Sequence, residues 1–363
     1  MRVKLKDITN YSKGSQVNSD CLIENGKYIY LNGGVNPSGK WNNYNVLSNT
    51  VTVSEGGNSS GYINYITEPF WCGAHCYYLF DGPKNTKYLY YALKSQQQRL
   101  FKLRSGACMP NIKKKDLGDF ELEFDFNEVI QNNIVNILDE CNKIIDNYHL
   151  ELELLDELIK ARFVEMFGEP RSNLFGFDKM MLKDTCKVIT GNTPSKAIAE
   201  YYGDYVEWIK TDNIVSGLLN PTRAAEFLSE KGVEVGKTVD KNSILMACIA
   251  GSIASIGRIC VTDRTVAFNQ QINAIVPQKY NILFLYVLLK ISKDYLTEDI
   301  NMALKGILSK SKLEKKQFIV PPIELQNKFS DFVRQVDKSK FEIQKSLEKT
   351  QELYDSLMQK YFG

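Results

Sequence analysis

The chain has 363 residues, of which 44% are hydrophobic and 24% are charged, with a formal net charge of +2. This length exceeds that of one ordinary domain and predicts two or three. The composition excludes a largely disordered chain, and no apolar stretch approaches the roughly 18 residues that a transmembrane helix needs. The polar N-terminal segment lacks the apolar core of a signal peptide, so we expect a cytoplasmic protein.

Charge is segregated along the chain. Residues 1–118 carry a net charge of +8 and residues 171–320 a net charge of +5, whereas residues 119–170 carry −11 and residues 321–363 are neutral. Lysine and arginine side chains neutralise phosphates, so the two basic blocks favour a polyanion as the partner. The alternative interpretation is a lysine-rich surface that only keeps the chain soluble.

The first basic block mixes short strands with one helical run. Runs of β-branched and aromatic residues bounded by Gly, Asn and Pro predict strands at Tyr28–Leu31, Thr50–Val53 and Cys76–Phe80. Helical periodicity follows over Lys87–Leu103. We therefore predict an α+β domain with a strongly bent, β-rich sheet.

The eight cysteines have irregular spacing, which predicts reduced and mostly buried thiols. Cys72, His75 and Cys76 place three soft ligands within five residues, but no second pair of ligands completes a tetrahedral zinc site. We favour a structural thiol cluster over a metal site, and we expect this chain to bind no metal and no cofactor.

The acidic segment has the periodicity of a long helix. Apolar residues recur at steps of three and four, and neither Pro nor Gly interrupts Asn127–Phe167. This predicts one helix of about 35–40 residues, about 50–60 Å long at a rise of ~1.5 Å per residue. Gly168 and Pro170 are expected to end it.

The last segment repeats this helical pattern after Pro321 and Pro322. One apolar stripe on so long a helix needs another long helix beside it, so the two segments predict an antiparallel coiled coil. The residues expected to pack within this pair are Ile137, Ile144, Leu152, Leu155, Ile159, Val336, Ile343, Leu347 and Tyr354.

The second basic block resembles the first, which predicts a tandem duplication. Its expected strands are Tyr205–Ile209, Ile244–Ile249 and Ile272–Val276, followed by a helical run at Ile282–Leu296. At an offset of 177 residues Gly14 matches Gly191, and at an offset of 195 Gln131 and Asn132 match Gln326 and Asn327. Both long helices also end in Phe-Gly. A period near 180 residues is right for two copies of one domain.

The predicted organisation follows from this duplication. It comprises a first globular domain at residues 1–119, a first long helix within residues 120–169, a second globular domain at residues 170–320 and a second long helix within residues 321–363.

The sequence carries no recognisable catalytic motif. It lacks a GxxxxGK[ST] phosphate loop, GxGxxG, HExxH and GxSxG, and it offers two histidines as general bases. The Gly-rich runs Glu55–Ile63 and Ile249–Ile259 lack the Lys-Ser/Thr pair of a phosphate loop, so we interpret them as tight turns. We predict a subunit without catalysis of its own; the alternative is a fused DNA methyltransferase or nuclease.

Amide and basic side chains gather in the expected loops. Asn and Gln pair with adenine and Arg or Lys with guanine, while other cations contact phosphates; for each residue the alternative is a solvated surface side chain. The candidate DNA-binding residues are Lys13, Lys27, Lys40, Trp41, Asn42, Asn43, Tyr44, Gln97, Arg99, Arg104, Lys113 and Lys114 in the first block, and Lys196, Lys210, Arg223, Arg258, Asn269, Gln270 and Gln271 in the second.

Several motifs together resemble the specificity (S) subunits of type I restriction-modification systems. In the first half, Leu122–Phe126 occupies the place of the Pro-Pro motif. The segments that carry the resemblance are Leu155–Gly168, Leu182–Lys196, Tyr205–Ile214, Gly251–Ile259, Ala267–Pro277, Ala303–Leu313 and Val320–Phe329.

The resemblance implies a division of labour. Each globular block would be a target recognition domain that reads one half of a split double-stranded DNA site, and the helices would be spacers. It also implies docking of two methyltransferase subunits and, through them, a restriction subunit, with S-adenosylmethionine bound by the methyltransferases. A coiled-coil interaction scaffold that does not bind DNA is the alternative.

Overall fold

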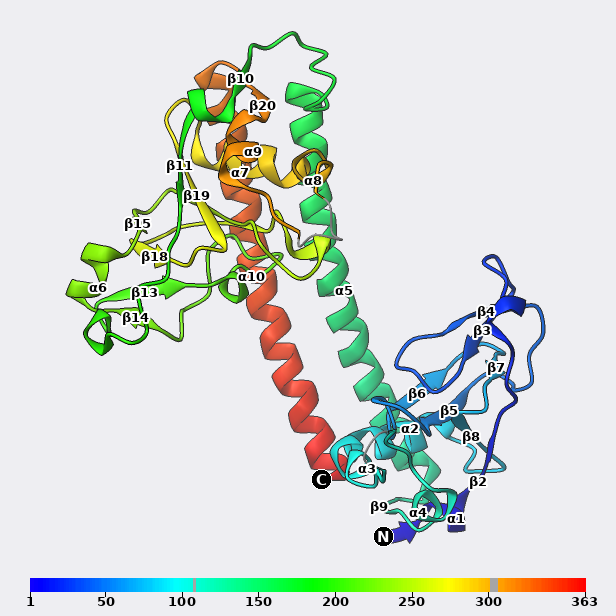
Figure 1. The fold of residues 1–363 in the computed structure, drawn as a ribbon. Helices are drawn as coiled ribbons and strands as arrows, with labels where there is room; N and C mark the ends of the chain where they lie inside the picture. The colour runs from blue at the N-terminus through cyan, green and yellow to red at the C-terminus, as the bar shows by residue number, and fades with distance from the viewer. Residues whose placement is uncertain (107–108, 301–305) are drawn as a thin grey trace. The chain divides into compact units, whose positions relative to one another are not determined.

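A computed structural model describes residues 1–106, 109–300 and 306–363 (Figure 1). These residues form two compact units, of which unit 1 comprises Met1–Leu150 with Gln344–Gly363 and unit 2 comprises Glu151–Ile343. Each unit contains one globular head and one half of each long helix. Cys108 and the first three residues of the motif Ala303–Leu313 lie outside the described residues.

The head of unit 1 contains three small sheets. The largest is a four-stranded antiparallel sheet with the order β2 (Asn10–Lys13), β8 (Cys76–Phe80), β5 (Thr50–Ser54) and β6 (Ile63–Ile66). The second has the order β4 (Gly39–Trp41), β3 (Tyr28–Leu31) and β7 (Trp71–Cys72), in which β3 and β7 are parallel. The third pairs β1 (Arg2–Lys4) with β9 (Glu121–Glu123).

Short helices complete this head. They are α1 (Leu5–Ile8), the 3₁₀ turn η1 (Ser19–Cys21), α2 (Thr86–Ser95), α3 (Gln97–Phe101) and α4 (Lys114–Gly118). Leu89 and Leu93 of α2 are buried together with Val51 and Val53 of β5. All five residues of β5 are buried, so both faces of the sheet are covered, and side chains of β6 and β8 also contact a second small core around Phe70.

The head of unit 2 has the same plan with a larger second sheet. Its four-stranded antiparallel sheet has the order β11 (Cys186–Thr190), β19 (Ile272–Pro277), β16 (Ile244–Ala247) and β17 (Ile259–Val261). Its second sheet has the order β12 (Tyr202–Gly203), β14 (Phe227–Leu228), β13 (Val206–Ile209), β18 (Val266–Phe268) and β15 (Thr238–Val239). The third pairs β10 (Lys179–Met181) with β20 (Gln317–Ile319).

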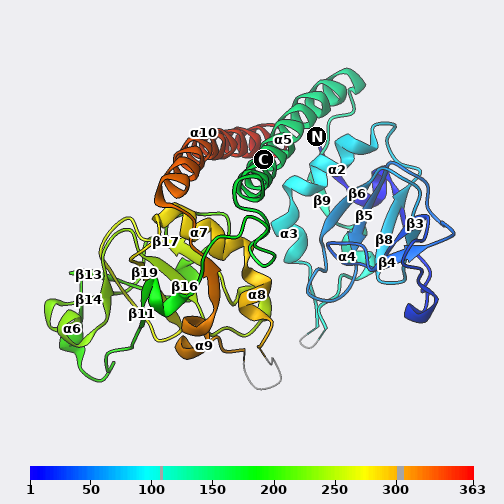
Figure 2. The same ribbon diagram turned by 90° about the horizontal axis from the view of Figure 1, so that it is seen from above.

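The helices of this head are again short. The α-helices are α6 (Glu230–Val235), α7 (Ile282–Ile291), α8 (Lys293–Thr297) and α9 (Lys310–Lys315), and the 3₁₀ turns are η2 (Leu182–Asp184), η3 (Ala199–Tyr201), η4 (Thr211–Asn213) and η5 (Ile253–Ser255). Figure 2 shows α7 beside the strands β16 and β19 on one side and α10 on the other.

Equivalent backbone hydrogen bonds confirm the internal repeat. Gly14 N donates to Cys76 O at 3.2 Å, and Gly191 N donates to Ile272 O at 3.0 Å. In the same way, the Glu55 N–His75 O and Cys248 N–Gln271 O bonds are both 2.8 Å long. The strand order β2-β8-β5-β6 also matches β11-β19-β16-β17. The repeat therefore extends to the pairing of individual strands.

The structure also explains why the repeat has two offsets. Arg2, at the start of β1, corresponds to Lys179 at an offset of 177, whereas Thr86, at the start of α2, corresponds to Ile282 at an offset of 196. The offset grows from 178 between β3 and β13 to 194 between β5 and β16. Most of the additional residues of unit 2 thus lie where its second sheet has five strands instead of three.

Each head was predicted to contain one helical run, but the structure has two consecutive helices there: α2 and α3 in the first head, and α7 and α8 in the second. The first break falls at Gln96, with φ −95° and ψ 16°, and the second at Ser292, with φ −93° and ψ 17°. Gln96 Nε2 donates to Phe362 O at 2.8 Å, a tertiary bond that helical periodicity cannot reveal. The matching dihedral angles show that the break belongs to the repeat.

The long helices are α5 (Glu128–Phe167) and α10 (Ile323–Phe362), each of 40 residues. A helix of this length extends about 60 Å. They are in antiparallel contact, since Leu138 is buried with Met358 in unit 1 and Phe163 with Phe329 in unit 2 (Figure 1). The predicted fold class, two β-rich α+β domains with two long antiparallel helices, is confirmed. No helix in the described part of the chain is long and apolar enough to span a membrane.

The predicted packing stripe is correct in part. Ile159, Val336 and Leu347 are buried, and Leu152, Leu155, Ile343 and Tyr354 are partly buried. Ile137 and Ile144, however, are 42% and 41% exposed. The buried positions beside them are Leu138, Cys141 and Ile145. Adjacent residues lie about 100° apart on a helix of 3.6 residues per turn, so a one-residue error moves a side chain off the contact face.

The matching Asn residues of the two long helices make equivalent hydrogen bonds in the two units. Asn85 Nδ2 donates to Asn132 Oδ1 at 2.8 Å, and Asn281 Nδ2 donates to Asn327 Oδ1 at 2.8 Å. Both bonds join the residue before a head helix to the first turns of a long helix. They fix the direction in which each long helix leaves its head.

The buried glutamines fix the starts of these helices. Gln326 Nε2 donates to Pro321 O at 2.8 Å, and Gln131 Nε2 donates to Asp125 O at 2.5 Å. Where α10 follows two prolines, α5 is capped by Asn127, whose Oδ1 accepts from Val129 N at 3.0 Å. An Asn cap therefore replaces the Pro-Pro start in the first half.

Aromatic packing joins the head of unit 2 to the helix pair. Phe163 and Phe167 of α5, Phe284 of α7 and Phe329 of α10 are fully buried. Phe163 lies 5.5 Å from Phe284 and 5.4 Å from Phe329 between ring centroids. Asp156 adds a polar link, because its Oδ1 accepts from Lys290 of α7 at 2.8 Å and from Lys340 of α10 at 2.9 Å.

Replacing Phe163 with Ala is expected to lower the free energy of unfolding by about 3–5 kcal/mol, because it leaves a cavity among three other rings. Urea denaturation followed by far-UV circular dichroism measures this. The matched control is Leu158→Ala on the same helix, where the side chain is 47% exposed, and it should cost less than about 1 kcal/mol. Equal losses in the two variants would contradict the packing described.

Candidate nucleic-acid interface

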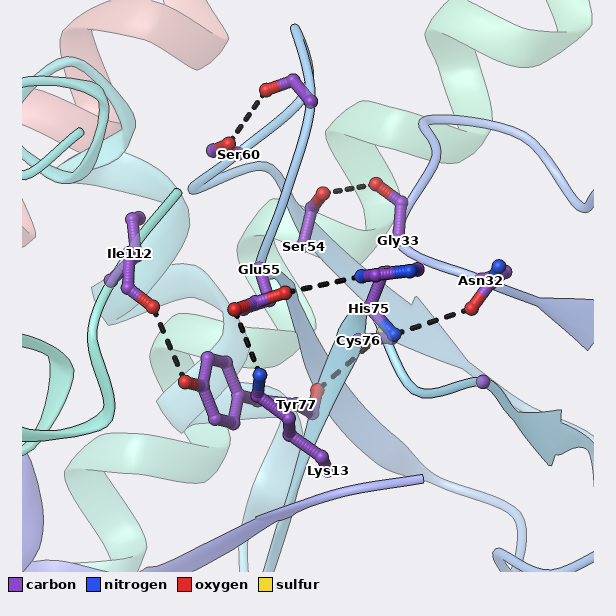
Figure 3. Close-up of polar contacts among 12 residues, drawn as sticks. Lys13, Asn32, Gly33, Ser54, Glu55, Ser60, His75, Cys76, Tyr77 and Ile112 are labelled. Carbon is purple, nitrogen blue, oxygen red and sulfur yellow. Dashed lines mark hydrogen bonds and ion pairs between the residues drawn. The ribbon is translucent and has the colours of Figure 1, made fainter. Parts of the chain in front are cut away.

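The Gly-rich run of the first head is a tight turn after β5 (Figure 3). Gly33 O accepts hydrogen bonds from the hydroxyls of Ser54 and Ser59, and Ser60 Oγ donates to Pro110 O at 2.7 Å. Gly57 has φ +76°, the left-handed region that glycine adopts without strain. The serines of this run bind backbone carbonyls of the same head, as expected for a tight turn.

A carboxylate lies beside this turn. Glu55 Oε1 pairs with Lys13 Nζ at 2.8 Å, and Glu55 Oε2 lies 3.4 Å from His75 Nδ1 (Figure 3). The Glu55 side chain is 13% exposed, whereas those of Lys13 and His75 are about half exposed. Burial, and then the charge of Glu55, raise the pKa of Tyr77 to about 12. Tyr77 therefore stays a neutral donor to Ile112 O.

The cysteines next to His75 are buried structural thiols. Cys72 Sγ donates to Cys76 O at 3.3 Å, and the contact with the Cys76 thiol, followed by burial, raises the pKa of Cys72 far above its ordinary value. His75 instead turns to Glu55. Within residues 1–106, 109–300 and 306–363, no group of three His, Cys, Asp or Glu side chains could hold a metal ion.

One glycine in each head permits close approach of two strands. A Cβ atom on Gly14 would lie 1.9 Å from Cys72 O, and one on Gly191 would lie 2.2 Å from Asn269 O. Both glycines follow the first strand of the four-stranded sheet, where the chain crosses the end of the parallel strand pair. Only a residue without Cβ fits there unless the backbone moves.

The second sheet of unit 1 brings together one set of candidate residues. Tyr28 and Tyr44 lie 5.1 Å apart and Trp41 and Trp71 lie 6.5 Å apart between ring centroids. Lys27 Nζ lies 5.1 Å from the centroid of the Tyr28 ring. Lys40, Asn42 and Asn43 are exposed on the same strand and loop. Sequence reasoning missed Tyr28 and Trp71, because the antiparallel pairing of β3 with β4 places Tyr28 opposite Trp41 and the parallel pairing of β3 with β7 brings in Trp71.

Other candidates of the first head have internal partners. Gln97 Oε1 accepts from Ile63 N at 3.1 Å, and Arg104 Nε donates to Ser60 O at 2.8 Å. Arg99 Nη1 donates to Gln96 Oε1 at 2.8 Å. The first two side chains thus hold the Gly-rich turn in place. Lys113 and Lys114 are exposed beside α4.

The second head brings three candidates around one carboxylate. Glu226 Oε1 pairs with Lys210 Nζ, and Glu226 Oε2 pairs with Lys196 Nζ at 3.4 Å. Both ammonium groups also lie over the ring of Trp208. The hydrogen bond from Lys210, partly offset by burial, lowers the pKa of Glu226. Arg223 is exposed three residues before this carboxylate.

The remaining candidates of the second head hold loops. Arg258 Nη2 donates to Thr211 O at 3.2 Å. Asn269 is 7% exposed, and its Oδ1 accepts from Gln271 N at 3.1 Å. Gln270 is exposed and bonds to Thr193. The structure thus corrects the placement of Asn269, whose amide lies inside the turn because the parallel pair β13–β18 ends there.

A further pair that sequence reasoning missed supports the segment carrying Arg223. Arg264 donates two hydrogen bonds to Glu207, at 3.0 and 2.7 Å, and Ala224 N donates to Glu207 Oε2 at 2.8 Å. Burial alone raises the pKa of Glu207, but these bonds hold it below its usual value. The signal in the sequence is a single acidic residue inside an otherwise apolar strand.

Comparison with known proteins identifies the class. A family model described as the type I restriction modification DNA specificity domain matches residues 1–155 and 176–353. The chain belongs to this family, that of the specificity (S) subunits. Specificity subunits are the noncatalytic members of type I systems, in agreement with the expectation from the missing catalytic motifs.

Individual relatives align over parts of the chain. A provisionally assigned type I specificity subunit of Mycoplasma genitalium is 33% identical over 41% of this chain and 40% of its own length. The specificity subunit of the type I restriction enzyme HindI of Haemophilus influenzae is 34% identical over 32% of this chain and 25% of its own length. The chain thus covers less than half of either relative.

A solved structure shares the fold. The crystal structure of a type I restriction-modification S subunit from M. genitalium matches with a TM-score of 0.66 at 23% identity, covering 100% of this chain and 96% of that chain. This likeness supports the fold, which consists of two β-rich domains with short helices and two long helices.

Replacing Gly191 with Ala is expected to destabilise the second head by about 1–3 kcal/mol, because the new methyl group collides with a carbonyl that cannot move independently. The matched control is Gly251→Ala, where a Cβ atom would meet no other atom within 4 Å. Thermal unfolding of both variants measures the difference. A Gly191→Ala variant as stable as Gly251→Ala would show that the strands are not closely packed there.

Proposed function

We propose that the chain is the DNA-reading subunit of a type I restriction-modification complex, and that each head reads one half of a split DNA site. The observation that carries this proposal is the internal repeat. The four-stranded sheets of the two heads share their strand order and equivalent backbone hydrogen bonds. The heads nevertheless present different side chains, which are Lys27, Trp41 and Tyr44 in the first and Lys196, Lys210 and Arg223 in the second.

The exposed residues suit different parts of DNA recognition. Lysines and arginines contact phosphates and set the register, whereas Asn42, Asn43 and Gln270 carry amides that can pair with base edges. Arg104, Gln97, Arg258 and Asn269 have internal partners, so their role in this proposal is to hold the reading loops.

The long helices would serve as spacer and docking surface. A 40-residue helix of about 60 Å is close to two turns of duplex at about 34 Å per turn. We infer that helix length sets the number of base pairs between the half-sites. We also infer that two methyltransferase subunits dock on the helices and that a restriction subunit joins through them. S-adenosylmethionine would bind to the methyltransferases, and the target adenine would be flipped into their pockets.

Exchanging residues 171–320 for the corresponding segment of another family member is expected to change one half of the methylated motif and leave the other half unchanged. Genome-wide methylation mapping in cells carrying the native or the exchanged chain measures this. The unmodified chain reports its own motif in the same experiment. A change in both halves, or a single contiguous motif, would contradict the assignment of one half-site to each head.

Replacing Leu347 with Glu is expected to reduce co-purification of the methyltransferase subunit, because a charge would enter the buried seam between α5 and α10. Leu347 is 7% exposed, whereas Leu353 on the same helix is 53% exposed, so Leu353→Glu is the matched control. Size-exclusion chromatography of the co-expressed subunits provides the measurement. Normal capture by both variants would place the docking surface elsewhere.

A further inference from the structure

Three lysines that are candidates for phosphate contacts already have carboxylate partners. Glu55 pairs with Lys13 in the first head, and Glu226 pairs with Lys196 and Lys210 in the second. The lysines are partly exposed, with side-chain exposures of 44%, 63% and 32%. They are therefore accessible to a polyanion, but each ammonium group already has a negative charge beside it.

The two carboxylates do not occupy equivalent positions of the repeat. Glu55 N donates to His75 O as Cys248 N donates to Gln271 O, so the residue equivalent to Glu55 is Cys248. Glu226 lies in the segment just before β14, in the enlarged second sheet of unit 2. The pairing of candidate lysines with a carboxylate thus arises separately in each head and is not a copied feature.

Glu226 is set into this position by the fold. Trp208 N donates to Glu226 O at 2.9 Å, which fixes the backbone of Glu226 against β13. Trp208 also lies beneath both lysines, with ring-to-ammonium distances of 6.0 Å for Lys196 and 5.1 Å for Lys210. Lys196, Glu226 and Tyr202 line a surface hollow of about 460 Å³. The carboxylate is therefore a built part of this surface.

A carboxylate between two lysines affects the two kinds of DNA binding differently. Binding to arbitrary sequence depends almost entirely on cations neutralising phosphates, and each phosphate contact adds about 0.9 to the slope of log affinity against log salt. A lysine engaged by a carboxylate contributes less, and the carboxylate itself repels phosphates. Binding to the correct site also gains from base contacts, so it loses a smaller share of its affinity.

We propose that Glu226, and in the first head Glu55, are specificity-determining residues that engage phosphate-binding lysines and so weaken binding to arbitrary DNA. This inference rests on the proposed function, because it requires that the heads bind DNA. It assigns to these acidic residues a role distinct from reading a base. A carboxylate that reads cytosine accepts a hydrogen bond from its N4 amino group, and its loss would weaken the specific complex instead.

The test uses the full chain, in the assembled complex with its methyltransferase subunits, and the variant Glu226→Gln. Fluorescence anisotropy with a random-sequence duplex should show about threefold to tenfold tighter binding and a salt slope steeper by about 1–2. Binding to the duplex carrying the mapped methylation motif should change less, so the ratio of specific to non-specific affinity should fall. Glu55→Gln should act in the same direction through Lys13.

The matched control is Glu165→Gln. Glu165 pairs with Arg162 at 2.7 Å on the long helix α5. Its side chain is 66% exposed against 36% for Glu226, and neither Glu165 nor Arg162 is a candidate for DNA contact. A second control repeats Glu226→Gln in a Lys196→Ala, Lys210→Ala background, where the substitution should have a much smaller effect on DNA affinity, because only the repulsion between the carboxylate and phosphates is then removed. Thermal unfolding of every variant confirms that the heads remain folded.

Unchanged or weaker binding of the random duplex by both Glu226→Gln and Glu55→Gln would overturn the inference. An effect of Glu226→Gln that is equally large without the two lysines would also overturn it. So would a loss of specific binding alone, which indicates base reading. A failure of the proposed function would give a different result. The unmodified complex would then show no salt-dependent binding to the random duplex or to the duplex carrying the motif.

Discussion

The attachment of each head to the two long helices is the interaction on which the rest of the structure depends. In unit 2 it consists of the buried rings of Phe163, Phe284 and Phe329, which come from α5, α7 and α10. A long helix with one apolar face cannot be stable alone in water, and neither can a small sheet with one apolar face. When the helices and the head pack together, each covers the apolar face of the other. The helix α7, which is buried along nearly its whole length, lies between them and gives both an apolar surface to contact.

The two copies of the repeat share the internal contacts that stabilise a head and differ in the side chains exposed on its surface. Gly14 and Gly191 make the same strand crossing, and Asn85 and Asn281 make the same bond to a long helix. These contacts are internal, so a change in either partner would cost stability. The loops outside them carry no such constraint. This separation lets a common scaffold hold two surfaces of different chemistry, as the proposed reading of two different half-sites would require.

Much of the fold could be predicted from the sequence, but less of the candidate interface. Periodicity without Pro or Gly located α5 to within one residue of its observed start, and β-branched runs located β3 and β8 without error. The same periodicity placed Ile137 and Ile144 between the two long helices, although both are exposed. The sequence of one helix does not show which of two neighbouring positions faces the other helix. Arg258 and Asn269 look like DNA contacts in sequence, yet their polar groups bond to backbone of the same head. Such bonds join residues far apart in the chain, and no local pattern records them.

The long helix α5 and the two heads carry net charges of opposite sign. The helix α5 carries a net charge of −6, whereas the basic blocks form most of the heads. An acidic helix surface repels phosphates and basic heads attract them, so under the proposed function DNA contacts would be confined to the heads. Within the heads, Glu226 and Glu55 refine the same principle over a few ångströms by engaging individual lysines. Attraction that is strong everywhere would hold the protein on any DNA, so acidic groups at both scales favour release from arbitrary sequence.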